Sequence, residues 1–370
     1  MRISLLEKRE DFYKILPETL AKVEITIKED YGKMNIYYVN KYLNFIATSE
    51  LKAELFTILV KEYSNSLKGW KKTIQKLYVW AAITPLFRSL LAHKKIKLPE
   101  KYSNFLILGG NHRLRLFSPE LTSSYVILKK GESVRFIENE IKLKNEINLS
   151  YAPGLITSGK NWIQEDYFEG TPINRIQDKR KQDEITERVI FMHFKELSNA
   201  TLEYNELNKF IETRIKEINS IIYNNEIRIE PDFVKNIEQA VSILTARLTS
   251  NDPIPVSWSH GDLQMANILV SNDNFKVIDW EASAKRFVFY DFFVLLGEMR
   301  IHGNFDKAIS WFEHKIKDYE LEISLPKHWK LLLALEELVY RINEDCSVNC
   351  FMSGKNIQKL CEDIVDISEK

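Results

Sequence analysis

The residues best suited to chemistry lie in one stretch of the chain, over residues 259–281. Asp262 and Asn267 come just before an apolar run, and Asp279 ends a second apolar run. Residues 271–274 have the composition of a turn, so we expect a β-hairpin that brings Asp279 back beside Asp262 and Asn267. Two carboxylates and an amide at strand ends supply the hard oxygen ligands that Mg²⁺ prefers. The sequence therefore predicts a magnesium site at this hairpin.

The same stretch resembles the catalytic and metal-binding loops of the aminoglycoside phosphotransferase/choline kinase family, which has a protein kinase-like fold. The resemblance rests on His-Gly-Asp at 260–262, on Asn267 and on Ile-Asp-Trp-Glu at 278–281. Protein kinases share the Asp-x-x-x-x-Asn spacing but normally have Arg after the His and Phe-Gly after the metal-binding Asp. The resemblance implies that Asp262 is the catalytic base that orients an acceptor hydroxyl, and that Asn267 and Asp279 hold Mg²⁺.

Three neighbouring residues are expected to support this site. We expect His260 to brace the loop rather than act as an acid or a base. Asp291 resembles the aspartate of the family that follows the metal loop and braces it. Glu281 is expected to make an outer contact to the metal, or a contact to a second metal ion.

A glycine turn and a lysine occur upstream, in the order that the family has them. Gly109 and Gly110 follow an apolar run, and glycines there let backbone N–H groups approach phosphates closely. The same pair also makes an ordinary hairpin turn. The next strand is expected over residues 125–129 and ends at Lys129, the place of a lysine that pairs the nucleotide phosphates. Lys130 is the alternative, and the alternation of side chains along the strand decides between them; we prefer Lys129.

A carboxylate on the following helix is predicted to position this lysine. Glu140 lies on the apolar face of a helix expected over residues 133–147, where a carboxylate needs a partner. We therefore predict an ion pair between Lys129 and Glu140, with Glu138 as the alternative to Glu140.

The segment at residues 162–172 is similar to the hinge of the family, and backbone groups around Glu165 to Tyr167 are expected to bind the adenine edge. The implied cofactors are ATP and Mg²⁺. The implied reaction is transfer of the γ-phosphoryl group to a hydroxyl of a small molecule or of a sugar or glycan. An acidic cluster in the C-terminal part is an argument for a cationic acceptor, and a neutral sugar hydroxyl is equally open. The cluster consists of Glu336, Glu337, Glu344 and Asp345.

The order of the predicted elements is that of an α+β, bilobal protein kinase-like fold. We expect an N-terminal α/β extension over residues 1–100, a small β-rich N-lobe and hinge over 101–170, and a large, mainly helical C-lobe over 171–370. Strands are expected at 23–27, 36–39, 104–108, 114–117, 125–129 and 162–165, a turn at 29–32, helices over 49–95 and 133–147, and helices from 183 onward apart from a β section at 256–279.

The composition is that of a globular chain, with 45% hydrophobic and 28% charged residues. The 52 basic and 52 acidic residues balance, which argues against a nucleic-acid binder. Three cysteines cannot form a disulfide framework, and Cys346 and Cys350 lack further zinc ligands nearby. With no signal peptide at its start and no apolar run of about 20 residues, the chain is expected to be cytoplasmic.

One segment departs from this balance of charge. Residues 63–99 contain eight basic residues and no acidic one. Bases and aromatic residues alternate over 68–95, as in a segment that lies on the inner, anionic face of a membrane. The alternative, which we favour, is a helical layer packed on the small lobe, with Leu77, Trp80 and Ile83 in its core.

Two other classes of function are considered beside the phosphotransferase. One is a kinase-like, nucleotide-binding regulatory protein without turnover, which the intact set of Asp262, Asn267 and Asp279 disfavours. The other is a membrane-associated scaffold that uses the basic segment.

Overall fold

The structure is a computed structural model. It describes residues 12–21, 33–64, 69–110, 112–223, 231–250, 252–319, 323–345 and 355–369. The chain divides into two compact units: unit 1 comprises Met1–Asn148 and Pro153–Thr171, and unit 2 comprises Leu149–Ala152 and Pro172–Lys370. The three-part division into residues 1–100, 101–170 and 171–370 remains a prediction.

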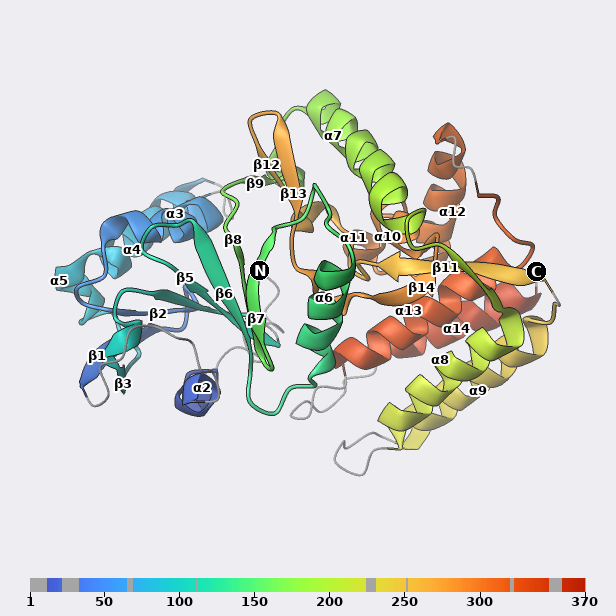
Figure 1. Ribbon diagram of the computed structural model, residues 1–370, viewed down its shortest axis with the longest axis horizontal. Coiled ribbons are helices and arrows are strands. Elements are labelled where there is room, and N and C mark those ends of the chain that lie inside the picture. The colour runs from blue at the N-terminus through green and yellow to red at the C-terminus, as the bar shows by residue number, and fades with distance from the viewer. Residues whose placement is uncertain are drawn as a thin grey trace. The chain divides into compact units, whose positions relative to one another are not determined.

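Unit 1 is built on an eight-stranded antiparallel sheet in the order β3-β1-β2-β4-β5-β6-β8-β7 (Figure 1). Its strands are β1 (Met34–Asn40), β2 (Phe45–Thr48), β3 (Lys94–Pro99), β4 (Leu106–Gly109), β5 (Arg113–Phe117), β6 (Ser123–Leu128), β7 (Leu155–Gly159) and β8 (Trp162–Asp166). Because β2 pairs with β4, the strands of the first hundred residues continue the same sheet as the strands predicted for the N-lobe.

Helices cover both faces of this sheet. They are α2 (Phe12–Ala21), α3 (Thr57–Ser64), α4 (Trp70–Ile83), α5 (Pro85–Arg88) and α6 (Arg135–Glu146), with short 3₁₀ turns η1 (Ala53–Phe56) and η2 (Glu100–Tyr102). Alternate side chains of a strand point to opposite faces, so Tyr37 of β1 packs with Leu16 of α2, whereas Phe45 of β2 packs with Leu59 of α3 and Val79 of α4. Figure 1 shows α3 and α4 on one side of the sheet and α2 on the other.

Helix α4 buries less of its apolar surface than the sequence predicts. Val79 and Ala82 face the core, and Ile83 packs at its edge. Leu77 and Trp80, predicted as core positions, are instead 61% and 58% exposed. The prediction is wrong for these two because they lie on the opposite side of the helix from the residues that contact the sheet.

Unit 2 is mainly helical. Its helices are α7 (Lys179–Met192), α8 (Leu207–Ile222), α9 (Pro231–Arg247), α10 (Tyr290–Leu296), α11 (Met299–His302), α12 (Phe305–Lys315), α13 (Trp329–Asp345) and α14 (Lys355–Glu369), with a π-helical turn η4 (His193–Ser198) and 3₁₀ turns η3 (Ile173–Arg175), η5 (Met265–Asn267), η6 (Trp280–Ala282) and η7 (Ile316–Asp318). Its strands are β10 (Glu203–Glu206), β11 (Pro253–Ser259), β12 (Ile268–Ser271), β13 (Asn274–Val277) and β14 (Ala284–Phe287), and β9 (Thr171–Pro172) lies at the boundary of the units. Strands β10, β11 and β14 form one sheet, and β12 and β13 form a hairpin.

The short segment Leu149–Ala152 belongs to unit 2, although its neighbours in the chain belong to unit 1. The N–H of Val277 donates to the carbonyl oxygen of Tyr151 at 2.7 Å. The side chain of Tyr151 is buried, and its hydroxyl lies 3.1 Å from Nδ1 of His193. Lys276 Nζ donates to the Ser150 carbonyl oxygen at 2.7 Å, so the segment is tied to unit 2 at several points.

Most predicted elements are confirmed. The strands expected at 36–39, 104–108, 114–117, 125–129 and 162–165 correspond to β1, β4, β5, β6 and β8, and the helix expected over 133–147 corresponds to α6. The helical segment predicted for 49–95 is wrong at its end, because Lys94 and Lys95 begin β3. The strand predicted at 23–27, the turn at 29–32 and the pair Cys346 and Cys350 lie outside the described residues.

In the described ranges, no helix combines the length and the apolar character that crossing a membrane requires.

Candidate active site

The hairpin brings two predicted metal ligands together. Strands β12 and β13 pair with Ile268 opposite Val277. One position further, the N–H of Ile278 donates to the carbonyl oxygen of Asn267 at 2.9 Å. Asp279 therefore follows directly on the residue that is bonded to Asn267, at the open end of the hairpin. This is the arrangement that the spacing of the two apolar runs predicts.

Asp279 has a left-handed backbone, with a φ of 70°. Asp and Asn tolerate this conformation better than other residues that have a Cβ. Asn267 and Asp279 offer one amide and one carboxylate oxygen, and Mg²⁺ normally combines one or two carboxylates with water and substrate phosphates. Within the part of the chain that the structure describes, no three His, Cys, Asp or Glu side chains form a metal-holding group. The pair thus fits a metal ion that is bound together with a phosphate ligand.

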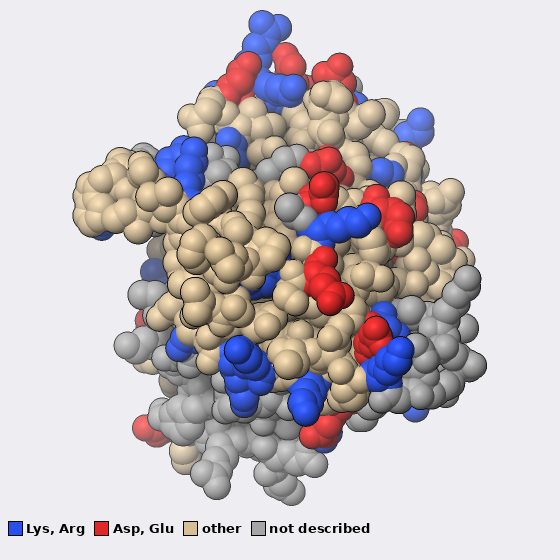
Figure 2. Space-filling model, turned by 90° about the vertical axis from the view of Figure 1, so that its left-hand side faces the viewer, with Lys and Arg blue, Asp and Glu red and all other residues tan. Residues whose placement is uncertain are grey.

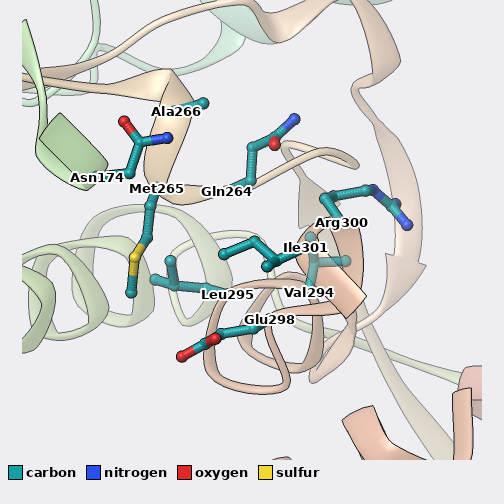
Figure 3. Close-up of a pocket in the computed structure, with 9 residues that line it drawn as sticks. All are labelled: Asn174, Gln264, Met265, Ala266, Val294, Leu295, Glu298, Arg300 and Ile301. Atoms are coloured by element: carbon teal, nitrogen blue, oxygen red, sulfur yellow. The ribbon is translucent and has the colours of Figure 1, made fainter. Parts of the chain in front are cut away.

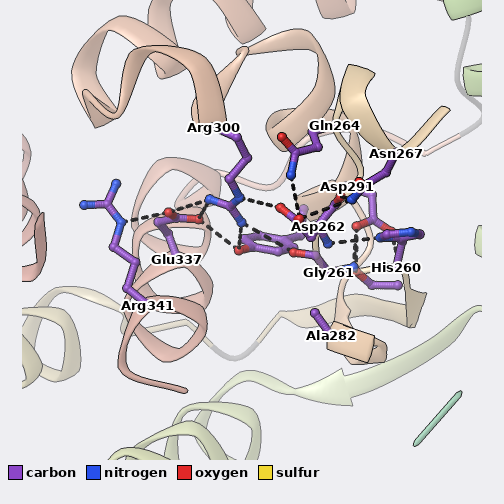
Figure 4. Close-up of polar contacts among 12 residues, drawn as sticks. His260, Gly261, Asp262, Gln264, Asn267, Ala282, Asp291, Arg300, Glu337 and Arg341 are labelled. Carbon is purple, nitrogen blue, oxygen red and sulfur yellow. Dashed lines mark hydrogen bonds and ion pairs between the residues drawn. The ribbon is translucent and has the colours of Figure 1, made fainter. Parts of the chain in front are cut away.

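The carboxylate of Asp262 is held by three donors (Figure 4). Oδ1 accepts from Nε of Arg300 at 2.7 Å, and Oδ2 accepts from Nε2 of Gln264 at 2.7 Å and from Nδ2 of Asn267 at 3.2 Å. The side chain keeps 18% of its surface exposed. Burial raises the pKa of Asp262 above its ordinary value, and the Arg300 guanidinium limits the rise. A fixed, partly exposed carboxylate of this kind is suited to accept a proton from a hydroxyl.

Arg300 is itself fixed by a buried network. Its Nη1 donates to both carboxylate oxygens of Glu337 at 2.8 and 2.9 Å, and its Nη2 donates to the Tyr290 hydroxyl at 3.1 Å. The guanidinium lies over the ring of Tyr340, 3.9 Å from its centroid. Nε of Arg341 also donates to Glu337, at 2.9 Å. Figure 4 shows Arg300 between Glu337 and Asp262, so we describe it as a positioning residue for Asp262.

The acidic cluster expected to face a cationic acceptor does not form an acidic surface at Glu336 and Glu337. Both side chains are fully buried. Glu336 is paired with Arg214 at 3.0 Å and with Arg286 at 3.4 Å, and Glu337 is paired with two arginines as described above. Because arginines balance both charges inside the protein, these two residues do not support a cationic acceptor.

Asp291 braces the loop that precedes Asp262. Its Oδ1 accepts from Oγ of Ser259 at 2.8 Å and from the N–H of Gly261 at 2.9 Å, and its Oδ2 accepts from the N–H of His260 at 2.7 Å and from Nε2 of His193 at 2.8 Å. Burial alone would raise the pKa of Asp291, but these donors, His193 first, hold it well below its ordinary value. The bracing role that the family resemblance implies is therefore present in the structure.

His260 and Gly261 complete the loop. Nε2 of His260 donates to the carbonyl oxygen of Ile278 at 2.9 Å, and Nδ1 accepts from the N–H of Asp262 at 3.2 Å. Burial lowers the pKa of His260, and both ring nitrogens are used, so it braces the loop as predicted. Gly261 has a φ of 82°, and a Cβ there would overlap the carbonyl group of Ala282. Only glycine fits this position without strain.

A small pocket in unit 2 adjoins Asp262 (Figure 3). Gln264 and Arg300, which both bind the Asp262 carboxylate, belong to its lining. The remaining polar lining is provided by Asn174 and Glu298, beside the backbone at Ala266. Its apolar lining consists of Met265, Val294, Leu295 and Ile301. Its volume is about 20 Å³, room for about one water molecule, so it is not itself a substrate pocket.

In unit 1, the predicted glycine turn and lysine lie together. Gly109 ends β4. The N–H of Gly110 donates to the carbonyl oxygen of Arg113 at 2.8 Å. A Cβ on residue 110 would lie only 2.7 Å from this oxygen, so the close approach requires glycine. Lys129 is 4% exposed, and its Nζ donates to the carbonyl oxygen of Gly110 at 2.6 Å. Lys130 is 44% exposed and pairs with a glutamate of α2. These contacts favour Lys129 over Lys130 as the lysine at the turn.

Glu140 has partners other than the predicted one. It is 2% exposed and is bound by Arg113 and by Nζ of Lys144, the latter at 2.8 Å. Burial alone would raise the pKa of Glu140, but Lys144 and Arg113 lower it to about 2. The predicted ion pair between Lys129 and Glu140 is therefore wrong, because two other cations occupy the Glu140 carboxylate. Glu138, the alternative, is exposed.

The predicted hinge residues take part in the sheet of unit 1. Glu165 is 2% exposed, and its carboxylate binds Nζ of Lys144 at 2.6 Å and Nη1 of Arg115 at 3.0 Å. The N–H of Tyr167 donates to the carbonyl oxygen of Thr122 at 3.0 Å and so extends the ladder between β6 and β8. The role of this segment in binding adenine stays a prediction, and it must use backbone groups other than this N–H.

Comparison with known proteins points to one family. No curated protein matches the chain. The model of the phosphotransferase enzyme family matches residues 225–327, which contain Asp262, Asn267 and Asp279. Among solved structures, a thermostable mutant of aminoglycoside phosphotransferase APH(4)-Ia in its apo form matches with a TM-score of 0.50 and 10% identity, over 72% of this chain and 94% of that chain. A second mutant of that protein, in ternary complex with AMP-PNP and hygromycin B, matches with a TM-score of 0.50 and 12% identity over the same shares. A choline kinase from Cryptosporidium parvum Iowa II matches with a TM-score of 0.43 and 14% identity, over 74% and 90% of the two chains.

The chain has the aminoglycoside phosphotransferase fold. The predicted family resemblance and the predicted α+β, protein kinase-like architecture are thereby confirmed. At identities this low the likeness establishes the fold, and activity has to be argued from the site itself.

Sequence reasoning missed three residues of this site. Gln264 lies in the predicted loop, and its amide two positions after Asp262 was the available signal. Arg300 is 38 positions from Asp262, and His193 is 98 positions from Asp291. No local pattern connects such distant positions, because folding alone brings them together. Arg300 is one of three charged residues in the mostly apolar stretch 290–302, so its charge alone did not single it out.

Proposed function

We propose that the chain is an ATP- and Mg²⁺-dependent phosphotransferase that moves the γ-phosphoryl group to a hydroxyl of a small molecule or of a sugar or glycan. One observation carries this proposal. The Asp262 carboxylate is fixed by Arg300, Gln264 and Asn267, beside the hairpin end that carries Asp279, within the segment that matches the phosphotransferase family model.

The chemistry of phosphoryl transfer fits this arrangement. Such reactions depend mainly on positioning the reactants and neutralising charge, with little covalent work for the protein. Asp262 orients the acceptor hydroxyl and takes its proton, and its raised pKa brings it closer to that task. Bound at Asn267 and Asp279, Mg²⁺ would neutralise phosphate charge. Lys129 is proposed to bind the nucleotide phosphates beside the turn at Gly110.

The charges around Asp262 support a neutral acceptor over a cationic one. Arg300 has its donors engaged by Asp262, Glu337 and Tyr290, so it is occupied within the protein. Because Glu336 and Glu337 are buried with arginine partners, a sugar or glycan hydroxyl is favoured over a cationic amine.

The decisive experiment measures transfer of label from γ-labelled ATP to a panel of sugars, envelope glycans, choline-like amines and aminoglycosides. We expect Mg²⁺-dependent labelling of at least one hydroxyl compound. The Asp262→Asn variant should lower kcat by about 10²–10⁴, the usual contribution of a positioned acid or base, while nucleotide affinity is retained.

A matched control uses Asp273, an exposed carboxylate in the turn of the same hairpin. Asp273→Asn should leave the rate unchanged. Full activity of Asp262→Asn would remove Asp262 from the mechanism. ATP binding without labelling of any compound in the panel would favour the regulatory alternative.

A further inference from the structure

Unit 1 exposes a set of large apolar side chains on two consecutive helices. In α4, Trp70 is 71% and Ile74 54% exposed, in addition to Leu77 and Trp80, whose exposed fractions are given above. The set continues through Leu86 and Phe87 of α5 to Leu90, which is 75% exposed. We call these seven residues the α4–α5 apolar surface. Seven large apolar side chains that are 38–75% exposed on consecutive helices are more than the single scattered apolar residues of an ordinary surface.

The surface is continuous across the corner between the two helices. At about 100° per residue, Trp70, Ile74, Leu77 and Trp80 fall within an arc of about 120° on α4, opposite the buried Val79. The rings of Trp80 and Phe87 lie 6.2 Å apart between centroids, which joins α4 to α5. Figure 2 looks onto the side of the molecule where Figure 1 shows α4 and α5, and it shows a broad uncharged area with blue side chains along its lower border and red ones to its right.

Lysines flank this surface. Lys71 and Lys76 lie at its two edges on α4, and both are exposed. The whole stretch of residues 63–99 contains no Asp or Glu. The apolar surface is therefore flanked by lysines of α4, within a stretch that has no acidic residue.

The combination of apolar and positive groups indicates which kind of partner binds the α4–α5 apolar surface. Two tryptophans among aliphatic side chains, with lysines at the border, are the features of a helix that lies in the interface of a bilayer with anionic headgroups. A second copy of the chain docked symmetrically would bring like charges against one another. The 14-residue α4 is about 21 Å long, so it can lie along a membrane surface but cannot cross it.

We propose that the α4–α5 apolar surface and its flanking lysines are a peripheral docking site for an anionic lipid bilayer. The aromatic and aliphatic side chains enter the boundary between headgroups and acyl chains, and the lysines bind lipid phosphates. This docking site does not depend on the proposed phosphotransferase activity.

The test measures cosedimentation of the full chain with vesicles of phosphatidylcholine alone and with vesicles of phosphatidylcholine mixed with phosphatidylglycerol. We expect binding to the mixed vesicles at low salt, at least tenfold weaker binding to the neutral ones, and release at high salt. Tryptophan fluorescence should shift to the blue on binding. Absence of binding to the mixed vesicles at low salt would overturn the proposal.

Variants separate the two contributions. Leu77→Ser combined with Trp80→Ser, and Lys71→Glu combined with Lys76→Glu, should each weaken binding to mixed vesicles at least tenfold. Because these residues are exposed, the circular dichroism spectrum should not change. The matched control is Phe191→Ser, which removes an aromatic residue of α7 that is 63% exposed. A loss of binding in the control as large as in the variants would contradict the proposal.

Sedimentation velocity without lipid tests the competing occupants. A monomeric chain supports the proposal. A dimer that Leu77→Ser with Trp80→Ser abolishes would assign the surface to contacts between copies and would overturn the lipid assignment.

Discussion

The guanidinium of Arg300 lies between two carboxylates in different surroundings. Glu337 is fully buried and accepts two of its hydrogen bonds, whereas Asp262 is partly exposed and accepts one. Glu337 and Tyr290 position Arg300, whose Nε lies 2.7 Å from Oδ1 of Asp262. An opposite charge at this range lowers the pKa of a carboxyl group by about 1–3 units. The pKa of Asp262 thus reflects burial that raises it and Arg300 that opposes the rise.

Replacing Arg300 should therefore change the pH dependence of the reaction. Asp262 accepts a proton only when it is ionised, so activity is lost as the pH falls through its pKa. Arg300→Gln removes the charge that lowers this pKa, so the acidic limb of the kcat profile should move to higher pH. The measurement is kcat against pH for the wild type and the variant with the best acceptor of the labelling panel.

Arg341→Gln is the control for this variant. It removes the other arginine on Glu337 without touching Asp262. Both variants should lower stability, because each leaves Glu337 with one cation fewer. Only Arg300→Gln should move the acidic limb, and an equal shift in Arg341→Gln would show that Arg300 does not act on Asp262.

Asp279 can be tested without disturbing its backbone. Asp279→Asn keeps a residue that tolerates a φ of 70° but removes the negative charge that a metal ion needs. We expect nucleotide affinity in the presence of Mg²⁺ to fall about tenfold or more, with little change in the absence of the metal. Calorimetric titration of nucleotide at several Mg²⁺ concentrations measures this. Equal affinities of variant and wild type at every Mg²⁺ concentration would exclude a metal role for Asp279.

At the scale of residues, the sequence predicts those parts of the site that are close together in the chain. Asp262, Asn267 and Asp279 lie within one loop and hairpin, whose geometry follows from turn and strand patterns. The partners of Glu140 could not be predicted, because Arg113 comes from a neighbouring strand and the choice among several nearby cations depends on packing. The same holds for Arg300.

At the scale of elements, α6 is joined to β5 and β8 by a buried chain of alternating charges. Its members are Arg113, Glu140, Lys144, Glu165 and Arg115. All except Arg115 are less than a tenth exposed. Burying an ion pair costs desolvation free energy, and removing one member leaves the charges of its neighbours buried without a partner. The chain of charges therefore fixes how the helix sits on the sheet.

Glu140→Gln should reveal this dependence. The pKa of Glu140 falls from 4.5 to about 2 on folding, so its ionisation stabilises the protein above pH 4.5, and this stabilisation is lost as the pH falls toward about 2. At neutral pH the variant should lose about 3–5 kcal/mol, the usual effect of breaking a buried pair. Its stability should also fall less steeply below pH 4.5 than that of the wild type. Urea unfolding of the full chain, measured at several pH values for the wild type and the variant, gives both effects.

The same helix provides the control. Glu146 is 46% exposed and lies 4.0 Å from Lys142, one turn away. An exposed pair of this kind contributes less than about 1 kcal/mol, so Glu146→Gln should leave the urea midpoint nearly unchanged. If Glu140→Gln were as mild as this control, the buried chain would not stabilise the unit.

Several elements that the sequence does not predict, or predicts only in part, lack a contrast between their two faces. Strand β7 exposes most of its residues, and β10, with the sequence Glu-Tyr-Asn-Glu, has no apolar alternation. Strand β14 is only four residues long. In α4 both faces are apolar, so periodicity indicates a helix but cannot tell which side meets the sheet. Tertiary packing decides such cases.

At the scale of the whole molecule, a few motifs were enough to predict the fold. Structures that share the fold are only 10% and 12% identical to this chain, so the fold was predicted from short motifs and the order of elements rather than from overall sequence similarity. The zero net charge was less informative, because it sums a basic segment on α4 and β3 with a body that is acidic on balance. The net charge of the whole chain therefore hides a basic segment at residues 63–99 and an acidic remainder.

The short segment Leu149–Ala152 has a practical consequence for dissecting the molecule. A C-terminal fragment that begins at Pro172, where the chain last passes from unit 1 to unit 2, would lack Tyr151. Val277 would lose the acceptor of its N–H, and His193 would lose the buried phenol beside its ring. Since His193 holds Asp291, the defect would reach the loop before Asp262. The helical unit is therefore encoded in two separate stretches of the gene, and a piece meant to fold alone has to begin upstream of Leu149.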